Sequence, residues 1–228
     1  MSRAFFITGT DTEIGKTTVA AGLLVAARRR GWSTAAGKPV ASGCHVEDGE
    51  LRNPDALALW AQCSEPLSYA AVNPFAFEPA IAPHLAARDQ GVALDVASLA
   101  SPMQMLLARR ADFTVIEGAG GWRVPLAAGQ TLADLAQYLA LPVILVVGVR
   151  LGCINHALLT AEAIQADGLQ LAGWVANVVD PQTSRLADNL ACLSERLPAP
   201  CLGQVPYLRE VGAEAVATHL DLTPLERW

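Results

Sequence analysis

The 228-residue chain is 52% hydrophobic and 17% charged, with a formal net charge of −6 at pH 7. Because disorder requires low hydrophobicity and high charge, this composition excludes a disordered chain and predicts one folded domain over residues 1–228. The acidic balance argues against a general nucleic-acid-binding protein, whose binding face is basic.

The apolar stretches and the cysteines predict a cytoplasmic protein that does not act at a membrane. Residues 138–149 are interrupted by Pro142 and are too short to span a bilayer, which takes about 20 residues. The amino-terminal residues lack the apolar region and cleavage site of a signal peptide. The five cysteines form no CxxC pair, which is typical of reduced thiols rather than of disulfides or a zinc site.

Short apolar runs alternate with longer amphipathic or alanine-rich stretches. In chain order they predict a strand at 5–8, a helix at 17–31, a strand at 34–40, helices at 55–63 and 96–110, a strand at 113–116, a helix at 131–139, a strand at 142–149, a helix at 155–167, a strand at 171–179, a helix at 184–197 and a strand at 201–205. This alternation predicts an α/β fold, a doubly wound, mainly parallel sheet with helices on both faces. The proline-rich residues 73–83 are interpreted as a loop or excursion within the same domain.

The segment Gly9-Thr10-Asp11-Thr12-Glu13-Ile14-Gly15-Lys16-Thr17-Thr18 follows a predicted strand and opens a predicted helix. This is the context of a phosphate-binding loop, in which backbone N–H groups and the helix N-terminus bind phosphates. Lys16 would neutralise phosphate charge, and the Thr17 hydroxyl would reach Mg²⁺. The first glycine falls one position earlier than in the usual pattern. The alternative is a glycine-containing turn before a capped helix.

Four further polar side chains stand at or near the ends of predicted elements. Lys38 and Ser42 belong to a segment at the end of the second strand, where open α/β sheets bind ligands, although composition alone favours a solvated lysine. Asp55 begins a helix and is either a metal ligand or a structural residue, a helix cap or an acidic residue of the first turn. Glu117 ends a buried strand before the glycine-rich turn Gly118-Ala119-Gly120, where phosphate-loop proteins place a second Mg²⁺ group.

The segment Gly152-Cys153-Ile154-Asn155-His156 follows the most apolar strand and begins a helix. Its backbone N–H groups could hold a carboxylate. A buried structural Cys153 and a helix-capping Asn155 are the alternative interpretation.

Taken together, these segments resemble the dethiobiotin synthetase family of the P-loop NTPase superfamily. Further matches are 72–74, 141–156 and 172–177, so that the resemblance extends to Pro206-Tyr207-Leu208. It implies a P-loop NTPase fold and an ATP- and Mg²⁺-dependent cyclo-ligase of biotin biosynthesis. The family carboxylates 7,8-diaminononanoate with CO₂ and closes the ring to dethiobiotin through a carbamate and a carbamic–phosphoric anhydride. It works as a homodimer with the substrate site at the subunit interface.

The resemblance also implies roles for individual residues. The expected catalytic residues are Lys38 and Lys16, and the expected Mg²⁺ ligands are Thr17, Asp55 and Glu117. The expected substrate-binding residues are Thr12, Lys38, Ser42, Gly152, Cys153, Ile154 and Asn155, the last four from the neighbouring subunit. The expected ATP-binding residues are Glu13, Ile14, Gly15, Lys16, Thr17, Thr18, Asp55, Glu117, Gly118, Ala119, Gly120, Asn177, Pro206, Tyr207 and Leu208.

Two other functions would also use a phosphate-binding loop. A switch ATPase of the partitioning type would carry a signature lysine where this chain has Asp11. An amide-forming ligase that acts on a large carboxylate usually carries an additional glutamine-hydrolysing domain, for which 228 residues leave no room.

Overall fold

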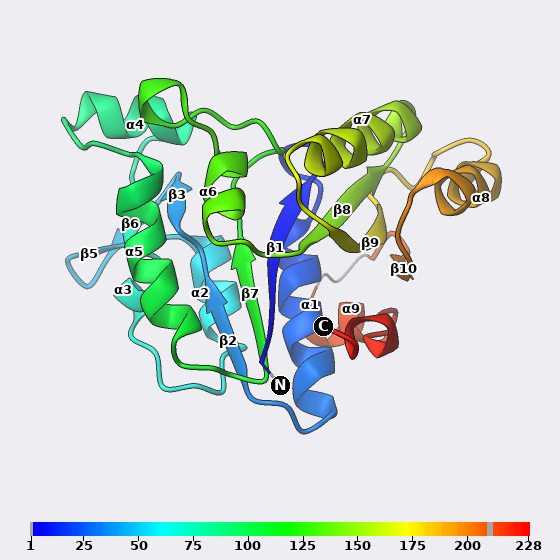
Figure 1. Cartoon of the computed structure of the whole chain (residues 1–228), viewed down its shortest axis with the longest axis horizontal. Helices are drawn as coiled ribbons and strands as arrows, with labels where there is room; N and C mark the ends of the chain where they lie inside the picture. The colour runs from blue at the N-terminus through cyan, green and yellow to red at the C-terminus, as the bar shows by residue number, and fades with distance from the viewer. Residues whose placement is uncertain (1, 209–211) are drawn as a thin grey trace.

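A computed structural model describes residues 2–208 and 212–228, and its centre is a six-stranded sheet (Figure 1). The strand order is β10-β9-β8-β1-β7-β2, and the paired strands of this sheet are parallel. The strands are β1 (Arg3–Gly9), β2 (Thr34–Gly37), β7 (Phe113–Glu117), β8 (Val143–Val149), β9 (Leu171–Val178) and β10 (Cys201–Val205). The predicted doubly wound parallel sheet is confirmed. With β7 and β8 on either side of β1, the loops after these three strands meet at one edge.

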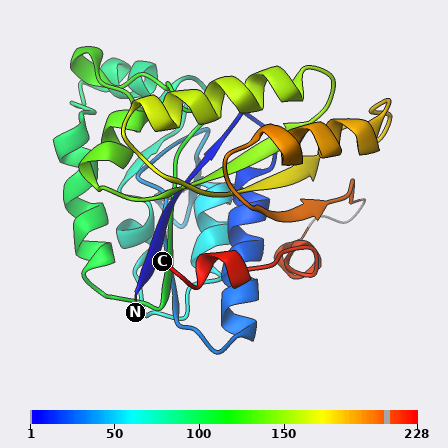
Figure 2. The ribbon, with the colours of Figure 1, turned by 45° about the vertical axis from the view of Figure 1, so that its right-hand side comes forward.

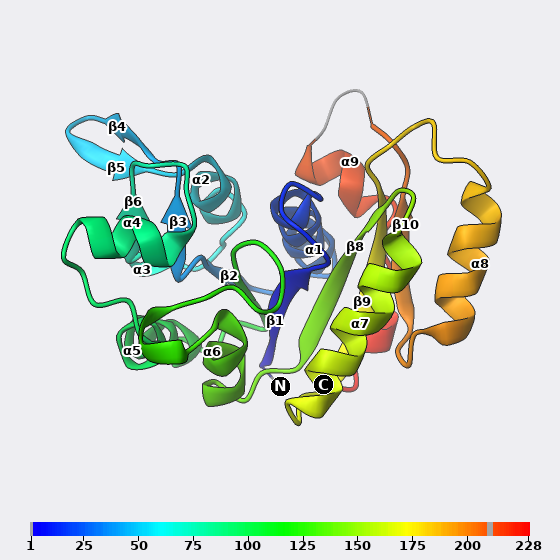
Figure 3. The same cartoon turned by 90° about the horizontal axis from the view of Figure 1, so that it is seen from above.

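Helices cover both faces of this sheet, as predicted (Figure 3). One face packs against α1 (Lys16–Arg29) and α9 (Ala213–Ala217). The other packs against α5 (Val96–Leu107), α6 (Leu132–Tyr138), α7 (Cys153–Ala166) and α8 (Leu186–Arg196), and Figure 2 shows α7 and α8 together on this side. Because successive strand residues point to opposite faces, Phe5 and Ile7 enter the first core and Phe6 the second.

The predicted strand over 34–40 is wrong in its second half. Strand β2 ends at Gly37, and after Lys38 and Pro39 the chain enters β3 (Val40–Ser42), which belongs to a separate sheet. The physical reason is Pro39, which has no N–H group and therefore cannot continue a strand ladder.

Short elements form a group beside the main sheet (Figure 3). Strand β6 (Phe75–Phe77) pairs with β3 in parallel, so residues 73–83 are an excursion that contains a strand rather than a plain loop. Strands β4 (His45–Glu47) and β5 (Glu50–Arg52) form an antiparallel hairpin. The helices are α2 (Pro54–Trp60), α3 (Tyr69–Val72) and α4 (Pro83–Asp89), with 3₁₀ turns η1 (Ala127–Gly129) and η2 (Thr223–Leu225) elsewhere. Within the described ranges, no helix is both long and apolar enough to cross a membrane.

Candidate active site

The phosphate-binding loop joins the central strand β1 to α1 and is closed by a glycine. Gly15 has φ 81°, in the left-handed region that glycine adopts at little cost, and it is the N-cap residue of α1. The Nδ2 group of Asn177, at the end of β9, donates a hydrogen bond of 2.8 Å to the Ile14 carbonyl. A Cβ atom on residue 15 would lie 2.3 Å from that nitrogen. The turn therefore requires glycine, and Asn177 holds it.

Lys16 lies inside this loop and is 7% exposed. Its Nζ donates a hydrogen bond of 2.7 Å to the carbonyl of Asp11. Burial, and secondly the nearby Lys38 ammonium, lower the pKa of Lys16 to about 8. A bound phosphate would reverse this shift, because it would stabilise the ammonium. The loop is therefore arranged to accept an anion.

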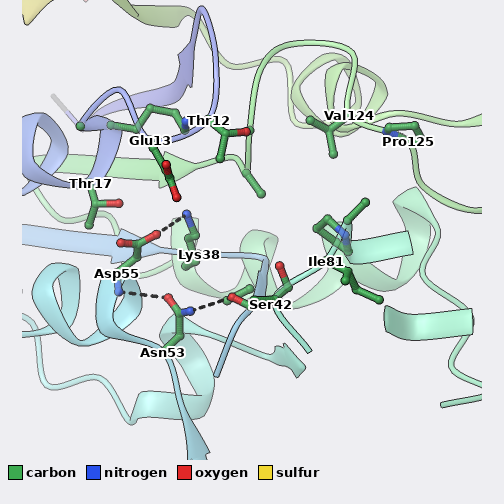
Figure 4. A pocket seen from close by; sticks show the side chains of 18 of the residues that line it. Thr12, Glu13, Thr17, Lys38, Ser42, Asn53, Asp55, Ile81, Val124 and Pro125 are labelled. Atoms are coloured by element: carbon green, nitrogen blue, oxygen red, sulfur yellow. Dashed lines mark hydrogen bonds and ion pairs between the residues drawn. The ribbon is translucent and has the colours of Figure 1, made fainter. Parts of the chain in front are cut away.

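Lys38 lies between the carboxylates of Glu117 and Asp55. Figure 4 shows the contact with Asp55. The lysine Nζ lies 2.5 Å from Oε1 of Glu117 and 3.5 Å from Oδ2 of Asp55, and it donates a hydrogen bond of 3.1 Å to the Gly118 carbonyl. The residue is 3% exposed, so the alternative of a solvated lysine is wrong. Burial alone would lower the pKa of Lys38, but the charges of Glu117 and Asp55 outweigh it and raise the pKa. Lys38 therefore stays a cation.

Asp55 stands in the first turn of α2, and its neighbour Asn53 is the residue that caps this helix. Oδ1 of Asn53 accepts hydrogen bonds from the N–H groups of Asp55 and Ala56. Asp55 is therefore not the capping residue, but it is the acidic first-turn residue that the structural alternative also allowed. Its half-exposed carboxylate points to Lys38 instead (Figure 4).

Three oxygen-bearing side chains meet here that fit a Mg²⁺ ion. The Thr17 hydroxyl donates a hydrogen bond of 2.8 Å to Oε1 of Glu117, and Asp55 reaches the same Lys38 ammonium. Glu117 is fully buried, and its Oε2 has no hydrogen-bond partner among the described residues. Burying an unpartnered carboxylate oxygen is costly, and hard oxygen donors are those that Mg²⁺ prefers. No cluster of three or more His, Cys, Asp or Glu side chains suited to a metal occurs in residues 2–208 and 212–228, so the set depends on the Thr17 hydroxyl.

Thr17, Lys38 and Asp55 line a cavity of about 810 Å³, whereas the fully buried Glu117 is not among its lining residues. Thirteen of its lining residues come from the phosphate loop, the β2–α2 segment and the glycine-rich turn, and they include these predicted site residues: Thr12, Glu13, Gly15, Lys16, Thr17, Thr18, Lys38, Ser42, Asp55, Ala119 and Gly120. An apolar wall faces them and was not predicted, because its residues carry no charge or motif; it comprises Ala80, Ile81, Ala82, Pro83, Val124 and Pro125 (Figure 4).

A second cavity of about 230 Å³ shares Glu13, Gly15 and Thr18 with the first. The predicted residues that line it are Asn177, Pro206, Tyr207 and Leu208. Its other lining side chains are valines, including Val216 of α9, which was not predicted because it lies in a short helix far along the chain. An apolar pocket beside a phosphate loop suits a flat aromatic base.

Residues 152–155 line neither of these cavities. Helix α7 begins at Cys153, which is buried, and its N-cap residue is Gly152 with φ 93°, so the capping role considered for Asn155 is wrong. An ion pair of 2.6 Å between Arg150 and Asp11 connects this turn with the phosphate loop. The Leu151 side chain next to it is 96% exposed.

Comparison with known proteins gives close relatives over nearly the full length. A family model described as an AAA domain matches residues 3–215. Proteins named ATP-dependent dethiobiotin synthetase BioD from Pseudomonas aeruginosa (strain UCBPP-PA14) and Cellvibrio japonicus (strain Ueda107) are 70% and 60% identical, over 97% and 98% of this chain and 97% of each relative. A protein from Salmonella typhi named ATP-dependent dethiobiotin synthetase BioD 1 is 49% identical over the whole of both chains.

Solved structures with a similar fold are much more distant in sequence. The MinD cell division protein of Aquifex aeolicus has a TM-score of 0.56 at 13% identity, covering 100% of this chain and 91% of that one. A ParA family ATPase from Chlorobium tepidum TLS has a TM-score of 0.55 at 12% identity, covering 100% and 94%. At such identities the likeness concerns the fold alone, and it confirms the predicted P-loop NTPase fold.

Proposed function

The chain belongs to the dethiobiotin synthetase family and is an ATP-dependent ligase of biotin biosynthesis, and from this premise we propose that it carboxylates 7,8-diaminononanoate with CO₂ and closes the product to dethiobiotin. The observation that supports this chemistry best is the buried Lys38 ammonium beside the phosphate loop. A switch ATPase needs no such cation in an 810 Å³ cavity with an apolar wall.

In the first step one amine of the diamine attacks CO₂, a C–N bond forms, and a proton leaves to give a carbamate. The Lys38 ammonium stabilises this anion. Its three N–H groups now face Glu117, the Gly118 carbonyl and Asp55, of which Asp55 is the most distant and the most exposed. The carbamate therefore takes the place that Asp55 holds on Lys38, while Thr12 and Ser42 contact the diamine.

In the second step a carbamate oxygen attacks the γ-phosphorus of ATP, and the bond from phosphorus to the ADP oxygen breaks. Two anionic groups must approach each other, so positive charge in a dry site is the main catalytic contribution. Lys16 and the N-terminus of α1 supply it at the phosphates, and Lys38 supplies it at the carbamate. Thr17, Asp55 and Glu117 would hold Mg²⁺, which when bound neutralises phosphate charge.

In the third step the second amine attacks the carbonyl carbon of the carbamic–phosphoric anhydride. The bond from that carbon to the phosphate oxygen breaks, phosphate leaves, and the amine proton passes to phosphate or solvent. Dethiobiotin, ADP and phosphate result. No general base is required, because each amine loses its own proton as it reacts.

The cavities fit the remaining parts of both substrates. The apolar wall from Ala80 to Pro83 with Val124 and Pro125 packs against the methylene chain of the diamine. Asn177 and the 206–208 segment bind the adenine in the second cavity. The protein forms a homodimer, and the 152–155 turn of one subunit binds the carboxylate of the diamine held in the active site of the other subunit. The chain acts as a single domain in the cytoplasm.

The test is ATP turnover with ¹⁴C-labelled CO₂, with and without 7,8-diaminononanoate. We expect ADP release to depend on the diamine and one labelled carbon to be fixed per ADP. A matched control substrate, 8-aminononanoate, has one amine and cannot close the ring, so it should fix no stable label. ADP release that ignores the diamine and fixes no carbon would favour the switch ATPase instead.

A further inference from the structure

The backbone of Lys38 is held by the 72–73 segment, which lines neither cavity. The Lys38 N–H group donates to the Val72 carbonyl at 2.7 Å, and its carbonyl accepts from Nδ2 of Asn73 at 2.8 Å. Lys38 belongs to neither neighbouring strand, and Pro39 offers no N–H group. The two bonds from the 72–73 segment therefore replace the strand ladder that would otherwise fix Lys38.

The same hydrogen bonds continue to the residues that carry Asp55 and Ser42. The Tyr69 hydroxyl accepts from the Asn53 N–H group at 2.8 Å and donates to Oδ1 of Asn73 at 3.1 Å. Asn53 caps the helix that bears Asp55, and its Nδ2 donates to the Ser42 carbonyl at 3.2 Å. We call Asn53, Tyr69 and Asn73 the Tyr69 network.

The Tyr69 network is buried, and the ring at its centre is fixed. The exposed fractions are 5% for Asn53, 7% for Tyr69 and 3% for Asn73. The Arg52 guanidinium lies 4.3 Å from the Tyr69 ring centroid. The Trp60 and Tyr69 rings pack in a T-shaped arrangement, with their centroids 5.9 Å apart. A buried polar network whose groups are bonded rigidifies the parts that it joins. Here it joins two segments of the site, Lys38 and the start of α2.

We propose that Tyr69 is a positioning residue whose hydroxyl sets the separation between the Lys38 ammonium and the Asp55 carboxylate. It does so by joining Asn73, which holds the Lys38 backbone, to Asn53, which holds the first turn of α2. The consequence for catalysis rests on the proposed function, in which Lys38 stabilises the carbamate and Asp55 helps to hold the metal. Tyr69 would align these two side chains with each other. A displacement of about 1 Å at such a site can cost about 100-fold in rate.

The variant Tyr69→Phe removes only the hydroxyl and keeps the ring contacts. Thr34→Val is a matched control, because the buried Thr34 hydroxyl also donates one hydrogen bond, to the Gln62 carbonyl, and accepts one, from the Ser64 N–H group. Thr34 lies at the opposite end of β2 from Lys38 and lines neither cavity. Both variants should lower Tm by a few degrees, so a loss of stability alone does not separate them.

The kinetic readout separates kcat from KM. For Tyr69→Phe we expect kcat for CO₂ fixation to fall about 10- to 100-fold while the KM for ATP stays within about twofold, because the phosphate loop lies outside the Tyr69 network. For Thr34→Val both constants should stay within about twofold of wild type. Equal kcat losses in the two variants would overturn the proposal.

The position of Lys38 can also be followed by NMR spectroscopy, without enzyme turnover. The spectrum is simple, because Lys16 and Lys38 are the only lysines of the chain. Protein labelled with ¹³C-lysine gives two side-chain Cε signals, which Lys16→Arg and Lys38→Arg assign. In Tyr69→Phe the Lys38 signal should shift and the Lys16 signal stay, and in Thr34→Val neither should move. A Lys38 signal unchanged by Tyr69→Phe would overturn the proposal even if the wild type is active.

The proposal can still be tested if Tyr69→Phe does not fold or if the wild type fixes no CO₂. If Tyr69→Phe does not fold, Asn73→Ala removes the bond to the Lys38 carbonyl and leaves the Tyr69–Asn53 bond in place, and it should shift the same Lys38 signal. If the wild type fixes no CO₂, the proposed function fails, but the Lys38 signal still decides whether Tyr69 positions the lysine.

Discussion

Replacement of Lys38 by methionine tests the buried ion pair at the centre of the site. The change keeps a side chain of similar length and removes the ammonium that lies 2.5 Å from Glu117. Because Lys38 and Glu117 are 3% and 0% exposed, the variant leaves a buried carboxylate without its partner. Breaking such a pair from one side costs about 3–5 kcal/mol. A domain has about 5–15 kcal/mol of stability, so we expect Lys38→Met to fold, with a Tm lower by roughly 6–20 °C.

A double-mutant cycle with Glu117→Gln isolates the pair. Urea unfolding is measured for the wild type, both single variants and the double variant, in the absence of nucleotide and metal. Removing both charges should restore about 2 kcal/mol or more relative to the sum of the single changes. Lys38→Met should also abolish CO₂ fixation. Additive single effects, or a cost below about 1 kcal/mol for Lys38→Met, would refute a tightly coupled buried pair.

Three further predictions follow from the site. Glu117→Gln should raise the Mg²⁺ concentration for half-maximal turnover by about tenfold or more, and an unchanged metal dependence would remove Glu117 from the metal site. The pKa of Lys16 is lowered to about 8, and bound phosphate should raise it. Lys16 should therefore take up about half a proton when ADP binds at pH 8, and almost none at pH 6.5, where it is already protonated. Calorimetry in buffers of different ionisation enthalpy measures this uptake, and its absence at pH 8 would contradict the prediction. Leu151→Asp should give monomers by light scattering and raise the KM for the diamine while ADP binding persists, whereas a fully active monomer would contradict a shared site.

The main sheet was predictable because its strands are buried on both faces. Residues 142–149 form a continuous apolar run, which is the pattern of an interior parallel strand, and β8 occupies Val143–Val149. The position of Glu117 followed from the same reasoning, since it ends such a strand. In contrast, β3 and β6 have three residues each, too few for a periodic pattern.

The charged residues of the site were predictable from motifs, but the buried residues that hold them in position were not. Lys16 and Lys38 follow strands, and both lie in the cavity. Tyr69 and Asn73 act through hydrogen bonds to residues that are distant in the sequence, and no local spacing encodes such partners. By contrast, Asn53 could have been identified as the helix cap from the sequence, because it is a favoured capping residue that directly precedes a proline at the first helical position.

The most direct test of the proposed chemistry is the fate of the oxygen atoms of CO₂. If a carbamate oxygen attacks the γ-phosphorus and the anhydride later opens at its carbon, ¹⁸O from labelled CO₂ must pass to the released phosphate. With ¹³C¹⁸O₂, ATP and 7,8-diaminononanoate, we predict dethiobiotin that carries ¹³C and phosphate that carries one ¹⁸O atom, in equal amounts by mass spectrometry. Labelled dethiobiotin with phosphate free of ¹⁸O would contradict phosphorylation of the carbamate, and phosphate released without labelled product would contradict the function.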